Sequence, residues 1–464
     1  MILKTMTTAI PEGIFRAYDI RGRYPAEVNE EIAAAIARAF VVYLRPWSVV
    51  LGRDVRKSGD KLFPAVRKAL VQSGVNVVDI GIVPAEVFYY AVATEDADGG
   101  VFISASHNGS EWNGLRLTRR EAEPISSESG LKEIYALTVS GASFKNRRPG
   151  KAVRKNVVPG YLGFIRSFIS ANDLRPMTLA LNGNFGVSAE LFESFVQKFK
   201  LPLKLVSLNA EPDGNFPKGA PNPMLEENWP EFSKFIIKKK ADLGIAWDGD
   251  GDQVFFADEA GKVIDGYFTM VLLVKEILAR SSGGTIVTDP RLVWPLRDIT
   301  RDLGGRLIVN RAGPLLAERM RKEGAYFAGE MTGHFYFRET LNRDSSFLAI
   351  LNILKLMSRE NKKLSALVAP LRKKYFSPGE FNFPLKSQAE VETALRAVAE
   401  VYADGKIERI DGLSVEYPTW RFNLRPSNTE PLLRLNMEAK NKKILVAELA
   451  KFKKLRQLIS EERS

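Results

Sequence analysis

The sequence predicts a fold of the α/β class, in which mixed α/β layers are followed by a smaller α+β region. Apolar runs of strand length alternate with amphipathic helical stretches through most of the chain, which is the pattern of stacked helix and sheet layers. A block of strand, polar or glycine-rich loop and helix repeats about three times in this part. After Tyr375 the pattern changes to an amphipathic helix and strand-like pieces around a loop, so we expect a smaller domain there.

The individual elements follow from the same periodicity. The expected strands are Ser48 to Leu51, Val75 to Ile80, Val101 to Ser104, Thr178 to Leu181, Leu243 to Trp247, Thr285 to Thr288 and Arg306 to Val309. The expected helices are Glu30 to Leu44, Lys61 to Val71, Ala189 to Lys198, Pro314 to Glu323, Ser345 to Ser358 and Glu390 to Tyr402. Near the C-terminus, lysines alternate with apolar residues at helical spacing, which predicts a docked helix with a solvated basic face.

Length and composition indicate a globular protein of several domains. The 464 residues exceed one ordinary core and suggest roughly three or four domains. Boundaries are expected where Arg147 to Lys155 interrupts the pattern, and near Asp258 and Tyr375. The longest apolar run, Tyr267 to Leu278, contains a lysine, and the N-terminus lacks a charged leader followed by an apolar stretch. We therefore expect a cytoplasmic protein.

The charge of the chain restricts its partners. A net charge of +12 is compatible with nucleic acid, an anionic membrane surface or small anionic substrates. No basic groove interleaved with aromatic residues appears, which argues against nucleic acid, and we expect no membrane partner. The chain has no cysteine, so any bound metal must be held by oxygen or imidazole.

Asp248, Asp250 and Asp252 alternate with glycines directly after an expected strand. Glycine permits the tight bends that let the three carboxylates converge, and such an oxygen cluster suits Mg²⁺ or Ca²⁺. An EF-hand would need glycine where Gln253 stands and helices on both sides, so that interpretation is weak. A solvated acidic turn is the remaining alternative.

Three further segments contain groups suited to phosphate chemistry. Ser106 follows an expected strand, and a phosphorylated serine there would match a divalent cation held by the aspartates; an ordinary loop serine is the alternative. Arg425, Ser427, Asn428 and Thr429 offer a guanidinium fork, hydroxyls and an amide for a phosphate monoester, or else form a capped turn. The only two histidines, His107 and His334, lie beside Ser106 and in the segment Gly329 to His334, and histidine is suited to proton transfer near neutral pH.

With these loops in this order, the chain resembles the α-D-phosphohexomutase superfamily, and most closely its bacterial phosphomannomutase and phosphoglucomutase branch. The resemblance also covers the segments Phe15 to Gly22, Gly52 to Arg56 and Glu211 to Pro217. It implies three related mixed α/β domains and a smaller C-terminal one around a central cleft. The corresponding ranges are 1–150 with the phosphoserine loop, 151–258 with the metal loop, 259–373 with the sugar loop and 374–464 with the phosphate loop.

The resemblance further implies a role for each site residue. Ser106 would carry the transferable phosphoryl group, and one Mg²⁺ per chain would bridge it to Asp248, Asp250 and Asp252. His334 is the candidate for proton transfer, with His107, Arg21 and Arg116 as further catalytic residues. The implied substrate-binding residues are Tyr18, Arg291, Glu330, Thr332, Arg425, Ser427, Asn428 and Thr429.

The implied activity is interconversion of hexose 1-phosphate and hexose 6-phosphate, with mannose or glucose as the sugar and hexose 1,6-bisphosphate as activator and intermediate. The partner would be a small phosphosugar, and the chain would be a monomer or weak dimer. Phosphoglucosamine mutase is a weaker alternative, because Glu330 to Thr332 fit the glucose and mannose branch better.

Four positions depart from the pattern of the branch. Gln253 stands where an arginine is usual, Gly109 where proline is usual, Arg116 where lysine is common and Pro314 where histidine is common. The loss of an arginine beside the phosphoserine would weaken charge neutralisation in the transition state. A catalytically degenerate sugar-phosphate-binding or regulatory protein is therefore the second hypothesis.

Overall fold

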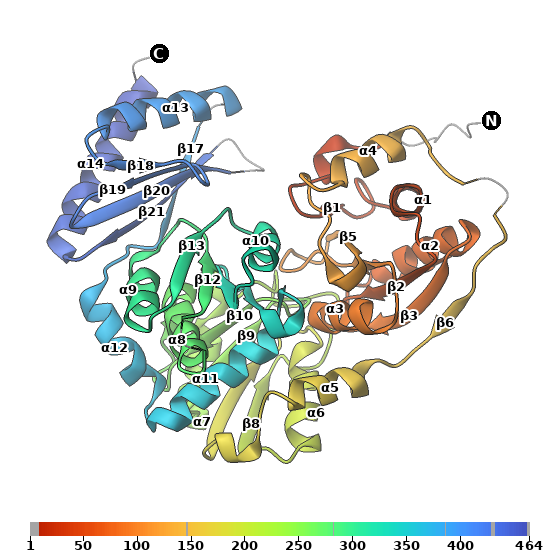
Figure 1. The fold of residues 1–464 in the computed structure, drawn as a ribbon, viewed down its shortest axis with the longest axis horizontal. Coiled ribbons are helices and arrows are strands. Elements are labelled where there is room, and N and C mark those ends of the chain that lie inside the picture. Colours follow the sequence, from red (N-terminus) through yellow and green to blue (C-terminus); the bar gives the residue numbers. More distant parts are fainter. Residues whose placement is uncertain (1–8, 145–146, 282, 386, 428–431, 462–464) are drawn as a thin grey trace. The chain divides into compact units, whose positions relative to one another are not determined.

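A computed structural model describes residues 9–144, 147–281, 283–385, 387–427 and 432–461 (Figure 1). The contacts divide the chain into two compact units. The first contains Met1–Ile264 and Thr332–Leu364, and the second contains Asp265–Met331 and Ser365–Ser464.

The first unit begins with a six-stranded sheet in the order β1-β5-β4-β2-β3-β6. Its strands are β1 (Ile20–Arg23), β2 (Ser48–Arg53), β3 (Asn76–Ile82), β4 (Gly99–Ile103), β5 (Trp112–Arg119) and β6 (Ala152–Arg154). The accompanying helices are α1 (Glu30–Leu44), α2 (Gly59–Gln72), α3 (Ala85–Thr94) and α4 (Leu131–Val139).

Alternation along the strands places helices on both faces of this sheet. Val49, Leu51 and Val101 share a buried cluster with residues of α1 and α2. Phe102 points the other way and stacks on Phe88 of α3, with ring centroids 5.0 Å apart. Successive strand side chains point to opposite faces, so apolar residues at consecutive positions require a cover on each side.

The second sheet of this unit has five strands in the order β11-β10-β9-β7-β8. The strands are β7 (Met177–Asn182), β8 (Leu203–Leu208), β9 (Leu243–Trp247), β10 (Val254–Ala257) and β11 (Val263–Ile264), with α5 (Val158–Arg166), α6 (Ser188–Lys198) and α7 (Pro230–Lys239). A hairpin of β15 (Phe335–Phe337) and β16 (Arg343–Asp344), followed by α11 (Ser346–Glu360), completes the unit.

The second unit combines parallel strands with an antiparallel sheet. Its first part contains α8 (Gly266–Leu278), β12 (Thr285–Thr288), α9 (Trp294–Asp302), β13 (Arg306–Val309), α10 (Leu315–Glu323) and β14 (Phe327–Gly329). After α12 (Leu364–Lys374), whose first residue closes the first unit, come β17 (Glu380–Pro384), α13 (Gln388–Val401), β18 (Lys406–Glu408), β19 (Leu413–Glu416), β20 (Trp420–Pro426), β21 (Leu432–Ala439) and α14 (Lys442–Glu461). The last five strands form one sheet, β17-β21-β20-β19-β18, on which α13 and α14 pack.

Short 3-10 helices connect several of these elements, and their ranges are Glu12–Ile14, Arg120–Ala122, Ala171–Asp173, Glu226–Asn228 and Arg338–Thr340.

The repeated block predicted from the sequence is confirmed by the strand order. β2 pairs in parallel with β3 and β4, β7 with β8 and β9, and β12 with β13 and β14. In each case the first strand of the block lies between the next two. This arrangement requires crossover connections, which the helices provide.

The expected elements all occur, and several of them have shifted ends. β4 stops at Ile103, one residue before the expected end, and the hydroxyl of Ser104 hydrogen-bonds the carboxylates of Asp54 and Asp250. α10 begins one residue after Pro314, which precedes the first helical position. The apolar run after Asp265 forms α8, where all residues but Lys275 are buried, so it is a core helix. Within the described part of the chain, we find no helix that combines the length and apolar character needed to span a bilayer.

Candidate functional site

Ser106 lies in the loop that follows β4 and is buried. Its backbone has a left-handed conformation with φ of 49°, which costs a residue with a side chain about 1 to 3 kcal/mol. The Oγ hydroxyl donates a 2.7 Å hydrogen bond to Oδ2 of Asp248 and lies 3.2 Å from Nδ1 of His107. The strained backbone therefore directs the hydroxyl at the first aspartate of the predicted metal loop.

A buried arginine, Arg56, holds the serine loop in this conformation. Its guanidinium donates hydrogen bonds to the carbonyl oxygens of Ser106 at 2.7 Å, Asn108 at 2.7 Å and Gly109 at 2.5 Å. Its charge is balanced by Asp54, with Nε and Oδ2 2.9 Å apart. The loop is thus anchored at Gly109 through its carbonyl group, although the glycine itself restricts the backbone little.

The three aspartates follow β9 and are fully buried, with at most 1% of each residue exposed. Oxygens of Asp248, Asp250 and Asp252 lie within 4.8 Å of one another. Burial first, and then the charges of the other two carboxylates, raise the pKa of Asp248 well above its ordinary value. Such repulsion between buried like charges favours the binding of a cation.

The oxygen atoms of this cluster fit a divalent cation. Oδ1 of Asp250 and Oδ1 of Asp252 are buried and have no hydrogen-bond partner among the described residues. A buried acceptor without a partner is costly, and hard oxygen ligands are the ones that Mg²⁺ prefers. The three aspartates and the oxygen of Ser106 are the residues that would hold the ion.

The glycines of the loop are required by close backbone contacts. A Cβ atom on Gly249 would lie 2.8 Å from the carbonyl oxygen of Ser106. Gly251 has φ of 78°, and a Cβ atom there would lie 1.8 Å from Oγ of Ser188. The flanking elements are the antiparallel strands β9 and β10, so the EF-hand alternative is excluded.

Arg116, on β5, supplies a positive charge to the aspartate loop. Its NH1 donates hydrogen bonds to Oδ2 of Asp252 at 2.5 Å and to the hydroxyl of Tyr89 at 2.6 Å, and its NH2 lies 3.4 Å from Oδ2 of Asp250. Burial alone would lower the pKa of Arg116, but Tyr89 and the two carboxylates outweigh it and raise the pKa well above its ordinary value. Arg116 therefore remains a cation.

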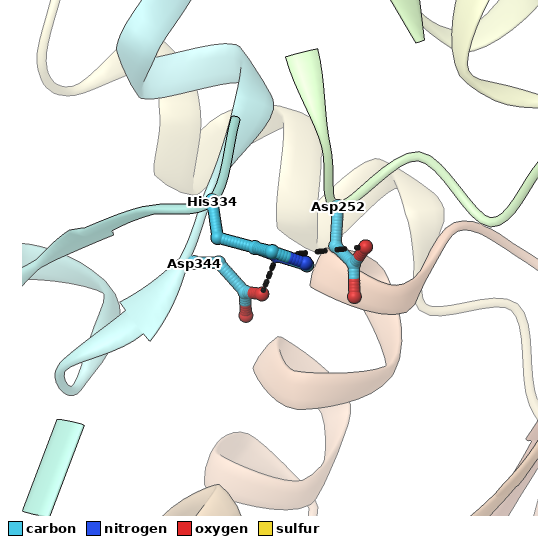
Figure 2. Close-up of side chains that lie close together, drawn as sticks. All are labelled: Asp252, His334 and Asp344. Atoms are coloured by element: carbon cyan, nitrogen blue, oxygen red, sulfur yellow. Dashed lines mark hydrogen bonds and ion pairs between the residues drawn. The ribbon is translucent and has the colours of Figure 1, made fainter. Parts of the chain in front are cut away.

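His334 lies between two carboxylates (Figure 2). Its Nδ1 is 2.9 Å from Oδ2 of Asp344 and 3.8 Å from Oδ1 of Asp252. Burial would raise the pKa of Asp344, but the charge of Arg343 and the hydrogen bond to His334 outweigh it and lower that pKa. An ionised carboxylate only accepts hydrogen bonds, so we assign the proton to Nδ1 and the lone pair to Nε2.

Asp252, His334 and Asp344 are also close enough to form a second potential metal cluster. In the assigned tautomer Nδ1 of His334 carries a proton toward Asp344 and has no lone pair for a metal. Because the other cluster offers three carboxylates with two unpartnered oxygens among the described residues, we favour Asp248, Asp250 and Asp252 as the cation site.

His107 lies in the serine loop itself, and Arg21 hydrogen-bonds the loop at Asn108. Burial first, and then the positive charge of Arg21, lower the pKa of His107 to about 3, so this histidine is neutral near pH 7. Arg21, on β1, pairs with Asp19 and donates a 2.6 Å hydrogen bond to Oδ1 of Asn108. Tyr18 is half-buried in the bend before β1.

Two arginines and Glu330 form a separate group in the second unit. Arg291 follows β12 and pairs with Asp289 at 2.7 Å and with Glu330 at 2.8 Å. Burial first, and then the charge of Arg291, lower the pKa of Arg425 at the end of β20. Among the described residues, the nearest carboxylate to Arg425 is that of Asp411, 3.8 Å away. With respect to these residues the guanidinium is paired only loosely, as an anion-binding group would be.

The structure brings together the predicted residues within each unit. In the first unit, Ser106, His107, Arg21, Arg116, the three aspartates and His334 are joined by direct contacts or by contacts with the same neighbours. Thr332 belongs to this unit, and its hydroxyl is buried without a hydrogen-bond partner among the described residues. Ser427 is buried in the second unit. Asn428 and Thr429 lie outside the described residues.

A hydroxyl beside a buried trio of carboxylates, with an arginine and a histidine close by, defines the class of metal-assisted phosphoryl-transfer sites. Family models for the phosphoglucomutase/phosphomannomutase α/β/α domains I, II and III match residues 12–143, 159–261 and 265–375, and the model for the C-terminal domain of the same family matches residues 380–454. The chain therefore belongs to the phosphoglucomutase/phosphomannomutase family of the α-D-phosphohexomutase superfamily.

Individual relatives agree with this assignment. The chain is 39% identical to phosphohexose mutases of Xanthomonas campestris over 92% of its length and 95% of theirs. It is 37% identical to the phosphomannomutase of Escherichia coli K12 over 92% of this chain and 94% of that one. A solved structure of a phosphoglucomutase/phosphomannomutase family protein from Burkholderia thailandensis is similar with a TM-score of 0.87 and 29% identity, covering 98% of this chain and 99% of that one.

Several residues of the site were not identified from the sequence as functional. Arg56 lies in a segment noted only for its resemblance, and nothing in the sequence shows that it binds the serine loop. Asp344 directly precedes two serines and a helix, where it is hard to distinguish from a capping residue. Outside these residues, a buried carboxylate with a better sequence signal is Glu86, the single charged residue of α3, which interrupts an apolar run.

Proposed function

We propose that this protein is a phosphohexose mutase that interconverts hexose 1-phosphate and hexose 6-phosphate, with mannose or glucose as the sugar. One observation carries the proposal: the hydroxyl of Ser106 lies 2.7 Å from buried Asp248, and one oxygen each of Asp250 and Asp252 has no hydrogen-bond partner among the described residues. A serine hydroxyl in that place is suited to accept and return a phosphoryl group next to a cation.

In the first half-reaction the bond from phosphorus to Oγ of phosphorylated Ser106 breaks, and a bond forms from phosphorus to the free hydroxyl oxygen of the sugar. Nε2 of His334 takes the proton of that hydroxyl, because Asp344 holds the proton on Nδ1. Oγ of Ser106 is left as an oxyanion in a site that also contains Arg116. The product of this half-reaction is hexose 1,6-bisphosphate.

In the second half-reaction the other phosphate of the bisphosphate returns to Oγ of Ser106. The bond from that phosphorus to the sugar oxygen breaks, and His334 returns its proton to the oxygen. Each end of the sugar must therefore be bound in turn. Arg291, Glu330, Arg425 and Ser427 would bind the sugar hydroxyls and the phosphate that does not react.

A Mg²⁺ ion held by Asp248, Asp250 and Asp252 would neutralise the charge that develops on the transferring phosphoryl group. Arg116 supplies a further positive charge at the same loop, where it pairs with Asp250 and Asp252. The chain thus retains a cation at the metal loop although Gln253 replaces the usual arginine. This arrangement favours an active enzyme over the degenerate binding protein.

Mass spectrometry of the purified chain tests the covalent step. The protein is incubated with Mg²⁺ and glucose or mannose 1,6-bisphosphate, and intact mass and peptide mapping follow the gain of a phosphoryl group. We expect a single phosphate on Ser106 and none in Ser106→Ala. Turnover of mannose 1-phosphate and glucose 1-phosphate is then compared. Full turnover by Ser106→Ala would refute the proposed function.

A further inference from the structure

Glu86 is a buried carboxylate near the N-terminus of α3, with 3% of the residue exposed. Both of its oxygens accept hydrogen bonds from serine hydroxyls. Oγ of Ser345 donates to Oε2 at 2.6 Å, and Oγ of Ser346 donates to Oε1 at 2.7 Å. Glu86 forms no ion pair within the described part of the chain. A buried carboxylate without a cation is expensive, so its retention calls for an explanation.

Two of the contacts around Glu86 lead to the metal loop. Its neighbour in the chain, Ala85, donates a 2.9 Å backbone hydrogen bond to the carbonyl oxygen of Asp250. Oγ of Ser346, which donates to Glu86, also accepts a 3.0 Å hydrogen bond from Nε1 of Trp247. Trp247 is the residue before Asp248. Glu86 is therefore linked to the metal loop in two ways, through Ala85 to the backbone of Asp250 and through Ser346 to the side chain of Trp247.

A third contact of Glu86, with Ser345, leads to the histidine. Ser345 follows Asp344, whose carboxylate binds Nδ1 of His334 at 2.9 Å. The backbone N–H of Ser345 donates a 3.0 Å hydrogen bond to the carbonyl oxygen of Phe335, the residue after His334. A shift of Ser345 would thus move both the carboxylate that orients the imidazole and the strand that carries it.

The surroundings of Glu86 contain few groups that stabilise its charge. The backbone amide of Phe347 at the start of α11 and the two serine hydroxyls favour the ionised form. Tyr161 of α5 is the titratable group that faces Glu86, and burial and then the charge of Glu86 raise the pKa of this tyrosine well above 10. Burial nevertheless dominates for Glu86 and raises its pKa to about 7.

We propose that Glu86 is a positioning residue of the mutase site, whose ionised carboxylate holds Ser345 and Ser346 and through them orients Asp344, His334 and the start of the metal loop. This inference rests on the proposed function for its kinetic consequences. A protonated or amide side chain has one acceptor oxygen and one donor group, so it cannot accept from both serine hydroxyls in the same way. The neutral form must therefore donate to one of the two serine hydroxyls instead of accepting from it, which reverses the hydrogen bond of that serine.

Kinetics of Glu86→Gln test the proposal. At pH 8 we expect kcat to fall about tenfold, as when an outer partner of a site residue is lost, while KM changes less than about twofold. As the pH falls to 6, the carboxylate of Glu86 in the wild type becomes protonated. The ratio of the wild-type kcat to the kcat of Glu86→Gln should therefore approach one. The matched control is Glu95→Gln, at the other end of α3, where the carboxylate pairs with Lys155 on the surface. A ratio that is the same at both pH values would overturn the proposal.

A second readout does not depend on turnover. The chain has only two histidines, so ¹⁵N-histidine labelling gives two imidazoles, which the His107→Gln variant assigns. In Glu86→Gln at pH 8 we expect the signals of His334 to shift and those of His107 to stay, and the same in the Ser345→Ala, Ser346→Ala double variant. Unchanged His334 signals in both variants would also overturn the proposal. A chain without mutase activity but with the expected His334 shift would refute only the proposed function.

Discussion

Glu86→Gln should also change the stability of the protein in a manner that depends on pH. The raised pKa means that the folded state binds a proton at Glu86 more tightly than the unfolded state, whose pKa is near 4.5. The contribution of Glu86 to the free energy of unfolding is thus fully present below pH 4.5 and is lost as the pH rises to about 7. This direction is opposite to that of a carboxylate in an ion pair.

The magnitude follows from the two pKa values. The pKa of Glu86 is about 7 in the folded state and near 4.5 in the unfolded state. This difference changes the contribution of Glu86 to the free energy of unfolding by about 3 kcal/mol between the low-pH and high-pH limits. Between pH 5 and pH 8 the wild type loses most of this contribution, about 2 to 3 kcal/mol. Glutamine does not titrate, so the variant lacks this loss. The quantity to compare is the free energy of unfolding of Glu86→Gln minus that of the wild type. This difference should be larger at pH 8 than at pH 5 by about that amount.

Urea denaturation followed by circular dichroism at pH 5 and pH 8 measures the effect. The two compact units need not unfold together. The free energy of unfolding is therefore taken from the first urea transition whose midpoint differs between the wild type and the variant. All other titrating groups are common to the two proteins and cancel in the difference. Glu95→Gln should show no such dependence on pH. The argument from burial would be refuted if the difference in the free energy of unfolding between Glu86→Gln and the wild type were the same at the two pH values, within about 0.5 kcal/mol.

Three further predictions concern the site. Asp344→Asn should reduce kcat by at least about tenfold with little change in KM, since the amide no longer selects the tautomer with the proton on Nδ1; steady-state kinetics decide, and unchanged kcat would contradict the role given to His334. Arg56→Met should lower the free energy of unfolding by about 3 to 5 kcal/mol, because Asp54 loses its ion pair and three carbonyl groups of the serine loop lose their donor. Urea denaturation measures this loss. A loss below about 1 kcal/mol would show that the loop is held in another way. Gln253→Arg should raise kcat less than about threefold, since Arg116 already pairs with the metal loop; a rise of about a hundredfold from a very low baseline would instead support the degenerate binding protein.

The fold was predictable from the sequence to a large extent. Periodicities of two and 3.6 residues are local properties of the chain, so the expected strands Leu243 to Trp247 and Thr285 to Thr288 and the helix Glu30 to Leu44 have the observed bounds. The three repeated blocks also appear as three parallel trios of strands. The four domain ranges, the cytoplasmic location and the oligomeric state stay predictions.

The chemistry of the metal loop was also readable from local sequence. Alternating aspartates and glycines after an apolar strand indicate converging oxygens, and the structure gives the reason for the glycines in the contacts that a Cβ atom would make with Ser106 and Ser188. These features depend on residues a few positions apart.

The residues that hold the site together were decided by tertiary structure. Arg56 lies 50 positions from the serine whose carbonyl group it binds, and Glu86 lies 259 positions from Ser345. Arg116, predicted to act on phosphate, is paired with aspartates 134 and 136 positions further along the chain. No local pattern in a single sequence specifies which of many charged side chains will meet. Such pairs form only when packing of the apolar helix and sheet faces has brought distant loops together and excluded water from them.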